Sequence, residues 1–131
     1  MDILFWLYLV NAVLLLNHEI DSAYWKEWEL FNLPGGITGF LLLHFPLIFI
    51  VLYGLVLIDR AAFWGFVCSL FLCCGGIFAF IIHFYFLKQG RREFNQPLSK
   101  AILLSTLVAS ITQLFYTVYI LRAYDWGRLF S

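Results

Sequence analysis

Three histidines and two nearby acids are the side chains with which this chain could do chemistry. His18, His44 and His83 fall in three separate apolar stretches, and Glu19 and Asp21 accompany the first histidine. Imidazole nitrogens and a carboxylate form a ligand set that zinc, iron or copper accepts. We therefore treat the three histidines as candidate metal ligands and the two acids as candidate catalytic groups.

The composition indicates that a lipid bilayer surrounds these groups. Of the 131 residues, 63% are apolar and only 12% are charged, whereas a soluble domain carries about 25% charged residues. A hydrocarbon core about 30 Å thick needs about 20 apolar residues in each helix that crosses it. Residues 1–131 therefore predict a single all-α domain, a bundle of four transmembrane helices at about 3–20, 37–58, 61–87 and 98–121.

The segments between these stretches differ in character. Residues 21–31 mix charged side chains with Tyr and Trp, which prefer the headgroup zone, and so predict an interfacial helical extension. Five Lys and Arg residues lie on the face that holds loops 21–36 and 88–98, against three on the other face. The excess predicts that these two loops are cytoplasmic and that both termini lie outside. We expect the membrane to be a bacterial inner membrane.

The three imidazoles are expected at a similar depth, because successive membrane helices run in opposite directions. His18 lies near the end of the first stretch, His44 two turns into the second and His83 one turn before the end of the third. All three then belong to the half of the bilayer that faces the longer loops. An ionisable group at that depth is costly and normally faces the protein interior, so we expect the rings to converge.

Polar residues recur at helical spacing in the first and fourth stretches. One face of the first helix would carry Asn11, His18, Asp21 or Ser22, Trp25 and Glu29. On that face, Asp21 lies one turn beyond His18 and could accept its imidazole N–H. One face of the fourth helix would carry Ser99, Thr106, Ser110, Gln113 and Thr117. We interpret the hydroxyls as interhelical contacts, while a buried Gln113 needs several partners.

The charge balance and the absence of common motifs exclude several classes of function. Eight basic and eight acidic residues cancel, so the chain has no electrostatic footprint for nucleic acid. It also lacks a phosphate-binding loop, a nucleophile elbow and a Cys-x-x-Cys pair. The partners that we expect are membrane lipid, an apolar small-molecule ligand, and further copies of the chain or a larger membrane complex.

Part of the first half resembles a known family. The run Asn17-His18-Glu19-Ile20-Asp21, a following Glu-Trp pair and the later His44-Phe45-Pro46 are similar to motifs in small bacterial membrane proteins of unknown function. The resemblance implies a four-helix membrane fold and brings no established activity. The same run is also faintly similar to membrane proteins with a His-x-x-Glu-Glu motif, but its spacing, His18-Glu19-Ile20-Asp21, departs from that motif.

Three functions remain open from the sequence, which does not decide whether the chain is an enzyme. The first is a metal site formed by the three histidines with Glu19, Asp21 or Glu29, with activated water or oxygen acting on a lipid-like substrate. The second is a metal-free membrane isomerase or carrier that uses His18 and an acid, or a haem protein with two axial histidines. The third is a structural membrane subunit in which the histidines only bond to neighbouring helices.

Overall fold

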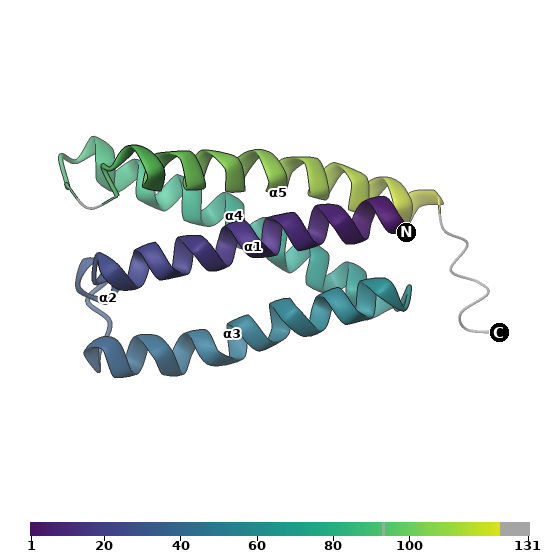
Figure 1. Cartoon of the computed structure of the whole chain (residues 1–131), viewed down its shortest axis with the longest axis horizontal. Helices are drawn as coiled ribbons and strands as arrows, with labels where there is room; N and C mark the ends of the chain where they lie inside the picture. Colours follow the sequence, from purple (N-terminus) through teal and green to yellow (C-terminus); the bar gives the residue numbers. More distant parts are fainter. Residues whose placement is uncertain (93, 124–131) are drawn as a thin grey trace.

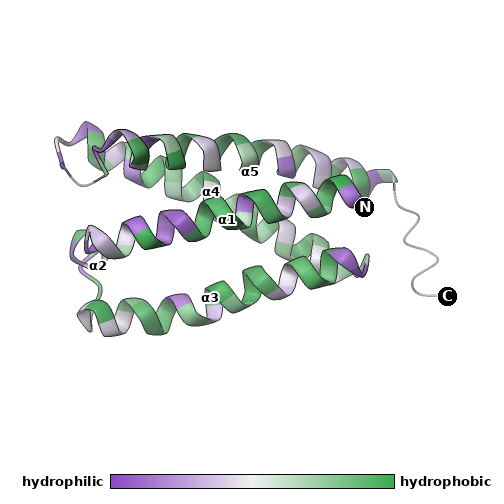
Figure 2. Cartoon of the chain, in the orientation of Figure 1, coloured by the Kyte–Doolittle hydropathy of each residue, from purple (hydrophilic) through white to green (hydrophobic). Residues whose placement is uncertain are grey.

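The computed structural model describes residues 1–92 and 94–123, and in this part of the chain short loops join helices (Figure 1). The elements are α1 (Asp2–Tyr24), α2 (Glu27–Leu30), α3 (Gly36–Asp59), α4 (Phe63–Lys88) and α5 (Pro97–Ala123). All but the short α2 are long and apolar enough to cross a membrane, and apolar colour runs along most of α3 and α4 (Figure 2). The predicted all-α architecture with four transmembrane helices is confirmed.

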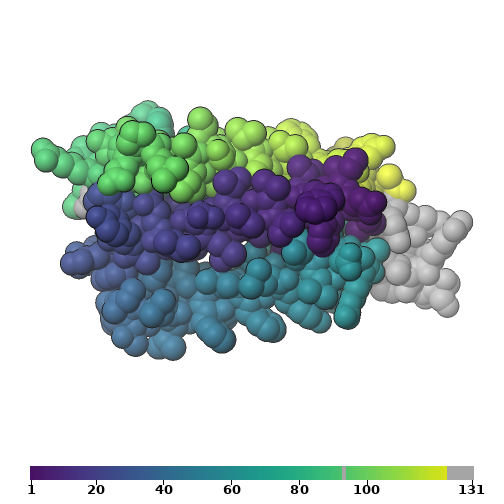
Figure 3. All heavy atoms as spheres, viewed as in Figure 1, coloured from purple at the N-terminus to yellow at the C-terminus, as the bar shows by residue number. Residues whose placement is uncertain are grey.

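The four long helices do not contact one another equally. Helices α1, α4 and α5 pack together, while α3 packs on α1 and α4 and, over the described residues, makes no contact with α5. Helices α3 and α4 lie close at their shared hairpin and diverge toward the end that carries α2 (Figure 1). Side chains of α1 fill the visible face between α3 and α5 (Figure 3). The four long helices therefore form a bundle in the cyclic order α1, α3, α4 and α5, and α1 and α4 also meet across its centre.

Small residues set how closely the helices approach. A Cβ at Gly65 would lie 2.7 Å from backbone atoms of Leu57 and Ile58, so the α3–α4 hairpin requires glycine there. A Cβ at Gly76 would collide with Ser110 Oγ on α5. Without a hydrophobic force between helices in lipid, such close approach is a main source of association.

A buried hydrogen-bond network joins α1, α4 and α5 at mid-height. Asn11 Nδ2 donates to Gln113 Oε1 (2.9 Å), and Gln113 Nε2 donates to Ser69 Oγ (2.8 Å). The Ser69 and Thr117 hydroxyls are 2.8 Å apart. The expected interhelical contacts are confirmed for the Ser110 and Thr117 hydroxyls, whereas the Thr106 hydroxyl donates to the Ile102 carbonyl of its own helix. Gln113 has the partners that a buried amide requires.

The helical extension expected at residues 21–31 is divided in two. Helix α1 continues to Tyr24, and Lys26 then adopts a left-handed conformation (φ 53°) before the single turn of α2. A left-handed residue cannot continue a right-handed helix, so the chain changes direction at this point. Neither Gly nor Pro marks the position in the sequence.

Candidate functional site

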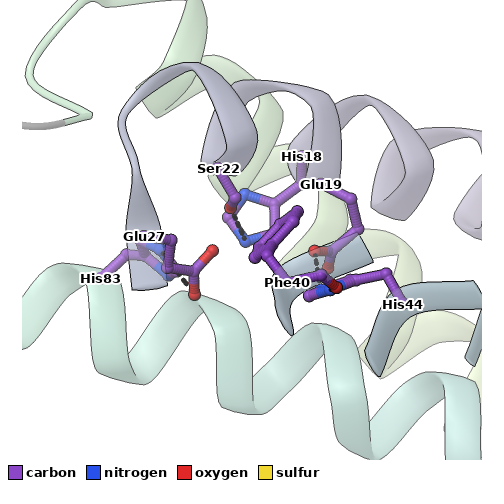
Figure 4. Close-up of polar contacts among 7 residues, drawn as sticks. All are labelled: His18, Glu19, Ser22, Glu27, Phe40, His44 and His83. Carbon is purple, nitrogen blue, oxygen red and sulfur yellow. Dashed lines mark hydrogen bonds and ion pairs between the residues drawn. The ribbon is translucent and has the colours of Figure 1, made fainter. Parts of the chain in front are cut away.

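One cavity of about 470 Å³ lies between α1, α3 and α4, and α2 closes one of its ends. Its lining is apolar apart from a small group of ionisable side chains. Those side chains are His18, Glu19, Glu27, His44 and His83 (Figure 4). The structure thus brings all three histidines to one cavity, although their roles in it differ.

His18 on α1 and His83 on α4 form the centre of the group. Each is 1% exposed, and their ring centroids are 4.6 Å apart with the rings nearly perpendicular. His83 Nδ1 lies 2.7 Å from the Ala79 carbonyl oxygen. Because a carbonyl can only accept, Nδ1 carries the hydrogen, and the neutral ring keeps a lone pair on Nε2.

Both rings also keep a buried nitrogen without a hydrogen-bond partner among the described residues. These atoms are Nδ1 of His18 and Nε2 of His83, while His18 Nε2 lies 3.4 Å from the Ser22 hydroxyl. Buried polar atoms almost always have partners, so each exception calls for an explanation such as an ion or a water. An unpaired nitrogen on each ring leaves both imidazoles able to bind a further ligand.

Glu27, the first residue of α2, completes the group. Its Oε1 lies 3.6 Å from His83 Nε2, which is too long for a hydrogen bond. Potential ligand atoms of His18, Glu27 and His83 all lie within 4.8 Å of one another. Zinc ligands at about 2.05 Å in a tetrahedron are about 3.3 Å apart, so modest side-chain rotations would close these three around an ion.

The electrostatic environment of Glu27 also favours a bound cation. Its side chain is 14% exposed, and burial raises the pKa of this carboxyl to about 7, an effect that the hydrogen bond from Ser22 only partly offsets. A bound cation would supply the charge compensation that water cannot provide inside the bundle.

His44 belongs to a separate pair on the cavity wall. Its Nε2 lies 2.7 Å from Glu19 Oε2, and its Nδ1 donates to the Phe40 carbonyl at 2.7 Å. The imidazole also stacks on the Phe40 ring, at 3.8 Å between centroids. Both ring nitrogens are thus engaged, and His44 is not in the group that could hold an ion.

The two acids singled out from the sequence have different positions. Glu19 lines the cavity beside His44. Asp21 does not line it, and its Oδ1 accepts a hydrogen bond from the Trp25 indole at 3.1 Å. Ser22, rather than Asp21, lies against the His18 ring, because a rotation of one residue along a helix moves a side chain by about 100°.

Sequence reasoning missed Glu27 and Phe94. Phe94 is fully buried, with its ring centroid 4.1 Å from that of His83 and 6.0 Å from that of His18. It covers both imidazoles from the side of the loop between α4 and α5. The signal that could have found Phe94 is a lone aromatic residue in a polar loop, and for Glu27 it is the Glu-Trp pair that the family resemblance includes.

Comparisons with known proteins give a family and no relative of known activity. A family model described as a family of unknown function (DUF6713) matches residues 4–120, nearly the whole chain. No curated protein and no solved structure matches. The chain therefore belongs to this family of unknown function.

Proposed function

We propose that this integral membrane protein binds one divalent transition-metal ion through His18, Glu27 and His83, with zinc as the first candidate. One observation carries the proposal: three potential ligand atoms from α1, α2 and α4 lie within 4.8 Å of one another. The two buried imidazole nitrogens without partners among the described residues support it.

The donor set suits catalytic rather than purely structural zinc. Metal-binding imidazoles commonly donate their other N–H to a backbone carbonyl, as His83 does to Ala79. Two imidazoles and one carboxylate occupy three of the four zinc positions and leave the fourth for water or substrate. Iron and copper accept the same donors.

A reaction at that fourth position would use metal-activated water. Zinc lowers the pKa of a bound water to about 7. The Glu19–His44 pair lines the same cavity, and we assign it the role of accepting the proton of that water. The substrate would be a lipid-like molecule, because the rest of the lining is apolar.

The test is the metal content of the purified protein. Protein stripped with EDTA in detergent should take up one zinc per chain, measured by elemental analysis after gel filtration. His18→Ala, His83→Ala and Glu27→Gln should each weaken zinc binding more than about 100-fold, because each removes a ligand. His44→Gln is the matched control and should retain stoichiometric zinc. A wild-type protein without metal, or three variants that all keep it, would overturn the proposal.

The pairing of Glu19 with His44 at 2.7 Å supports a second candidate, a metal-free membrane isomerase that moves protons through this pair. Elemental analysis without metal, a visible spectrum without haem, and an activity abolished by Glu19→Gln would favour it.

We also infer the orientation and location of the site. The Lys and Arg excess on loops 21–36 and 88–98 supports a cytoplasmic location for the end of the bundle that carries α2 and Glu27. The membrane would be a bacterial inner membrane.

A further inference from the structure

The apolar part of the cavity is about as long as one leaflet is deep. Its lining extends along α3 from Phe40 to Val51 and along α4 from Phe71 to His83. At 1.5 Å per residue these stretches span about 16 and 18 Å. Half of a hydrocarbon core about 30 Å thick is about 15 Å. The cavity therefore has the length of a single acyl chain that lies parallel to the lipids of one leaflet.

The cavity wall opens sideways between α3 and α4. Leu43, Phe71 and Phe78 line the cavity, yet they are 49%, 48% and 63% exposed on the outer surface of the bundle. At Gly75, also in the lining, an added Cβ would meet no atom within 4 Å. An apolar chain could thus enter from the bilayer without unfolding a helix.

The ionisable side chains at the polar end of the cavity determine which charge the polar group of a bound lipid can carry. A divalent ion held by two neutral imidazoles and the Glu27 carboxylate has a net charge of one positive unit, and the neighbouring Glu19 and His44 compensate each other. No Lys or Arg of the described part of the chain lines the cavity. A small group with a single negative charge completes this balance, and a carboxylate oxygen is an ordinary zinc ligand.

The burial of the imidazoles limits the size of that group. His18 and His83 are each 1% exposed, and Phe94 covers both rings. A phosphodiester headgroup would place a further substituent beyond its charged oxygens, against these covered rings. A carboxylate ends at its two oxygens and needs no such space.

We propose that the cavity binds one long-chain fatty acid, with its hydrocarbon chain between α3 and α4 and its carboxylate at the fourth position of the metal. This inference rests on the proposed metal site. It identifies the ligand class of that site as free long-chain carboxylic acids, which would displace the metal-bound water and enter from the surrounding leaflet.

The experiment is photo-crosslinking of zinc-loaded protein in dodecyl maltoside. The probe is a palmitate that carries a diazirine in the middle of its chain, and mass spectrometry locates the label. Label should appear on residues 40–51 and 71–83, and excess palmitate should reduce it at least tenfold. Methyl palmitate, which has the same chain but no carboxylate, should compete at least tenfold more weakly. Competition by both compounds alike would overturn the assignment of the carboxylate.

The variant that tests the cavity is Gly75→Leu, which places a side chain in open space away from the metal ligands. It should reduce competable labelling at least fivefold and keep one zinc per chain. Cys74→Leu is the matched control: it alters the adjacent, lipid-exposed position and should label like wild type. Octanoate should compete at least tenfold more weakly than palmitate in the wild-type protein, a measurement that needs no variant.

Zinc content, measured in every sample before lipid is added, separates the two proposals. One zinc per chain together with labelling that palmitate does not displace, or that Gly75→Leu does not reduce, overturns the fatty-acid inference and leaves the metal site intact. A protein without zinc at that first step overturns the metal site itself.

Discussion

Replacing Glu27 by glutamine should stabilise the metal-free protein at alkaline pH and largely remove its response to zinc. The reason is the burial of this carboxyl in the cavity, which raises its pKa from an ordinary value of 4.5 to about 7. The amide of glutamine has nearly the same shape and carries no charge at any pH. The variant therefore removes the cost of burying an anion along with the metal ligand.

The sign and size of the effect follow from the two pKa values. The unfolded chain ionises Glu27 near pH 4.5 and the folded chain near pH 7. The stability that neutral Glu27 contributes is therefore fully present below pH 4.5 and is lost as the pH rises through about 7. At 1.36 kcal/mol per pH unit, the loss is about 3 kcal/mol by pH 8. Taking the difference between wild type and Glu27→Gln cancels the titrations that the two proteins share.

The assay is the free energy of unfolding in mixed detergent micelles, followed by tryptophan fluorescence from pH 4.5 to 8.5 in EDTA. The advantage of Glu27→Gln should grow from near zero at pH 4.5 to about 3 kcal/mol at pH 8. Glu29→Gln is the matched control: it removes a carboxylate of the same segment whose side chain is 64% exposed, and it should show no comparable gain in stability at pH 8.

Zinc should close most of this gap in stability at pH 8. At a concentration 100 times its dissociation constant, an ion that binds only the folded state stabilises it by about 2.7 kcal/mol. Wild type should gain this amount at pH 8, and Glu27→Gln, whose affinity for zinc is more than about 100-fold weaker, should gain less than about 0.4 kcal/mol. A difference in EDTA that is independent of pH, or a wild type that is more stable than the variant at pH 8, would refute the reasoning.

Four further predictions concern the bundle and its orientation. Gln113→Leu should lower the free energy of unfolding by about 1–2 kcal/mol, because it removes two interhelical hydrogen bonds worth about 0.6 kcal/mol each on average; an unchanged value would contradict the network. Gly76→Ala should cost about 1–3 kcal/mol through overpacking, measured in the same assay. Gly75→Ala, where a Cβ meets nothing, should be neutral or stabilising by up to about 1 kcal/mol. In intact cells, an impermeant maleimide should label Asp59→Cys and spare Gln89→Cys, and the opposite pattern would invert the topology.

The membrane fold could be predicted from the sequence because lipid imposes a simple rule. Each span needs about 20 apolar residues, and the chain shows four such stretches separated by polar or turn-forming residues. The buried face of α5 was also predictable, since Ser99, Thr106, Ser110, Gln113 and Thr117 recur at helical spacing. Both predictions use only distances along the chain.

For the candidate site, the sequence predicts how deep each histidine lies in the bilayer but not the direction in which its side chain points. Topology gives the height of each histidine in the bilayer, and all three do line one cavity. The rotation of each helix about its axis decides which rings meet. That rotation depends on contacts between residues that are far apart along the chain. His44 on α3 pairs with Glu19 on α1 at the cavity wall. His18 on α1 instead meets His83 on α4.

The two residues that sequence reasoning missed share a cause. Glu27 follows Lys26 (φ 53°), and Phe94 is itself left-handed (φ 63°). Neither position carries the glycine that normally marks such a conformation. Only tertiary contacts hold Lys26 and Phe94 in the left-handed conformation. Local sequence patterns therefore predict that Glu27 is a solvated acid and that Phe94 is an ordinary loop aromatic.

The position of α2 links the candidate metal site to the folding of the bundle edge. A helix of four residues has no stability of its own. Aromatic contacts hold this segment in place: Trp28 lies 5.6 Å from Phe40 on α3, and Phe31 lies 5.6 Å from Phe86 on α4, between ring centroids. The same segment places Glu27 beside His83. An ion bound by that carboxylate would therefore tie α2 to α1 and α4, and docking of α2 and metal binding should stabilise each other. This coupling would hold the cavity end closed more firmly when the ion is present than when aromatic contacts alone hold α2 in place.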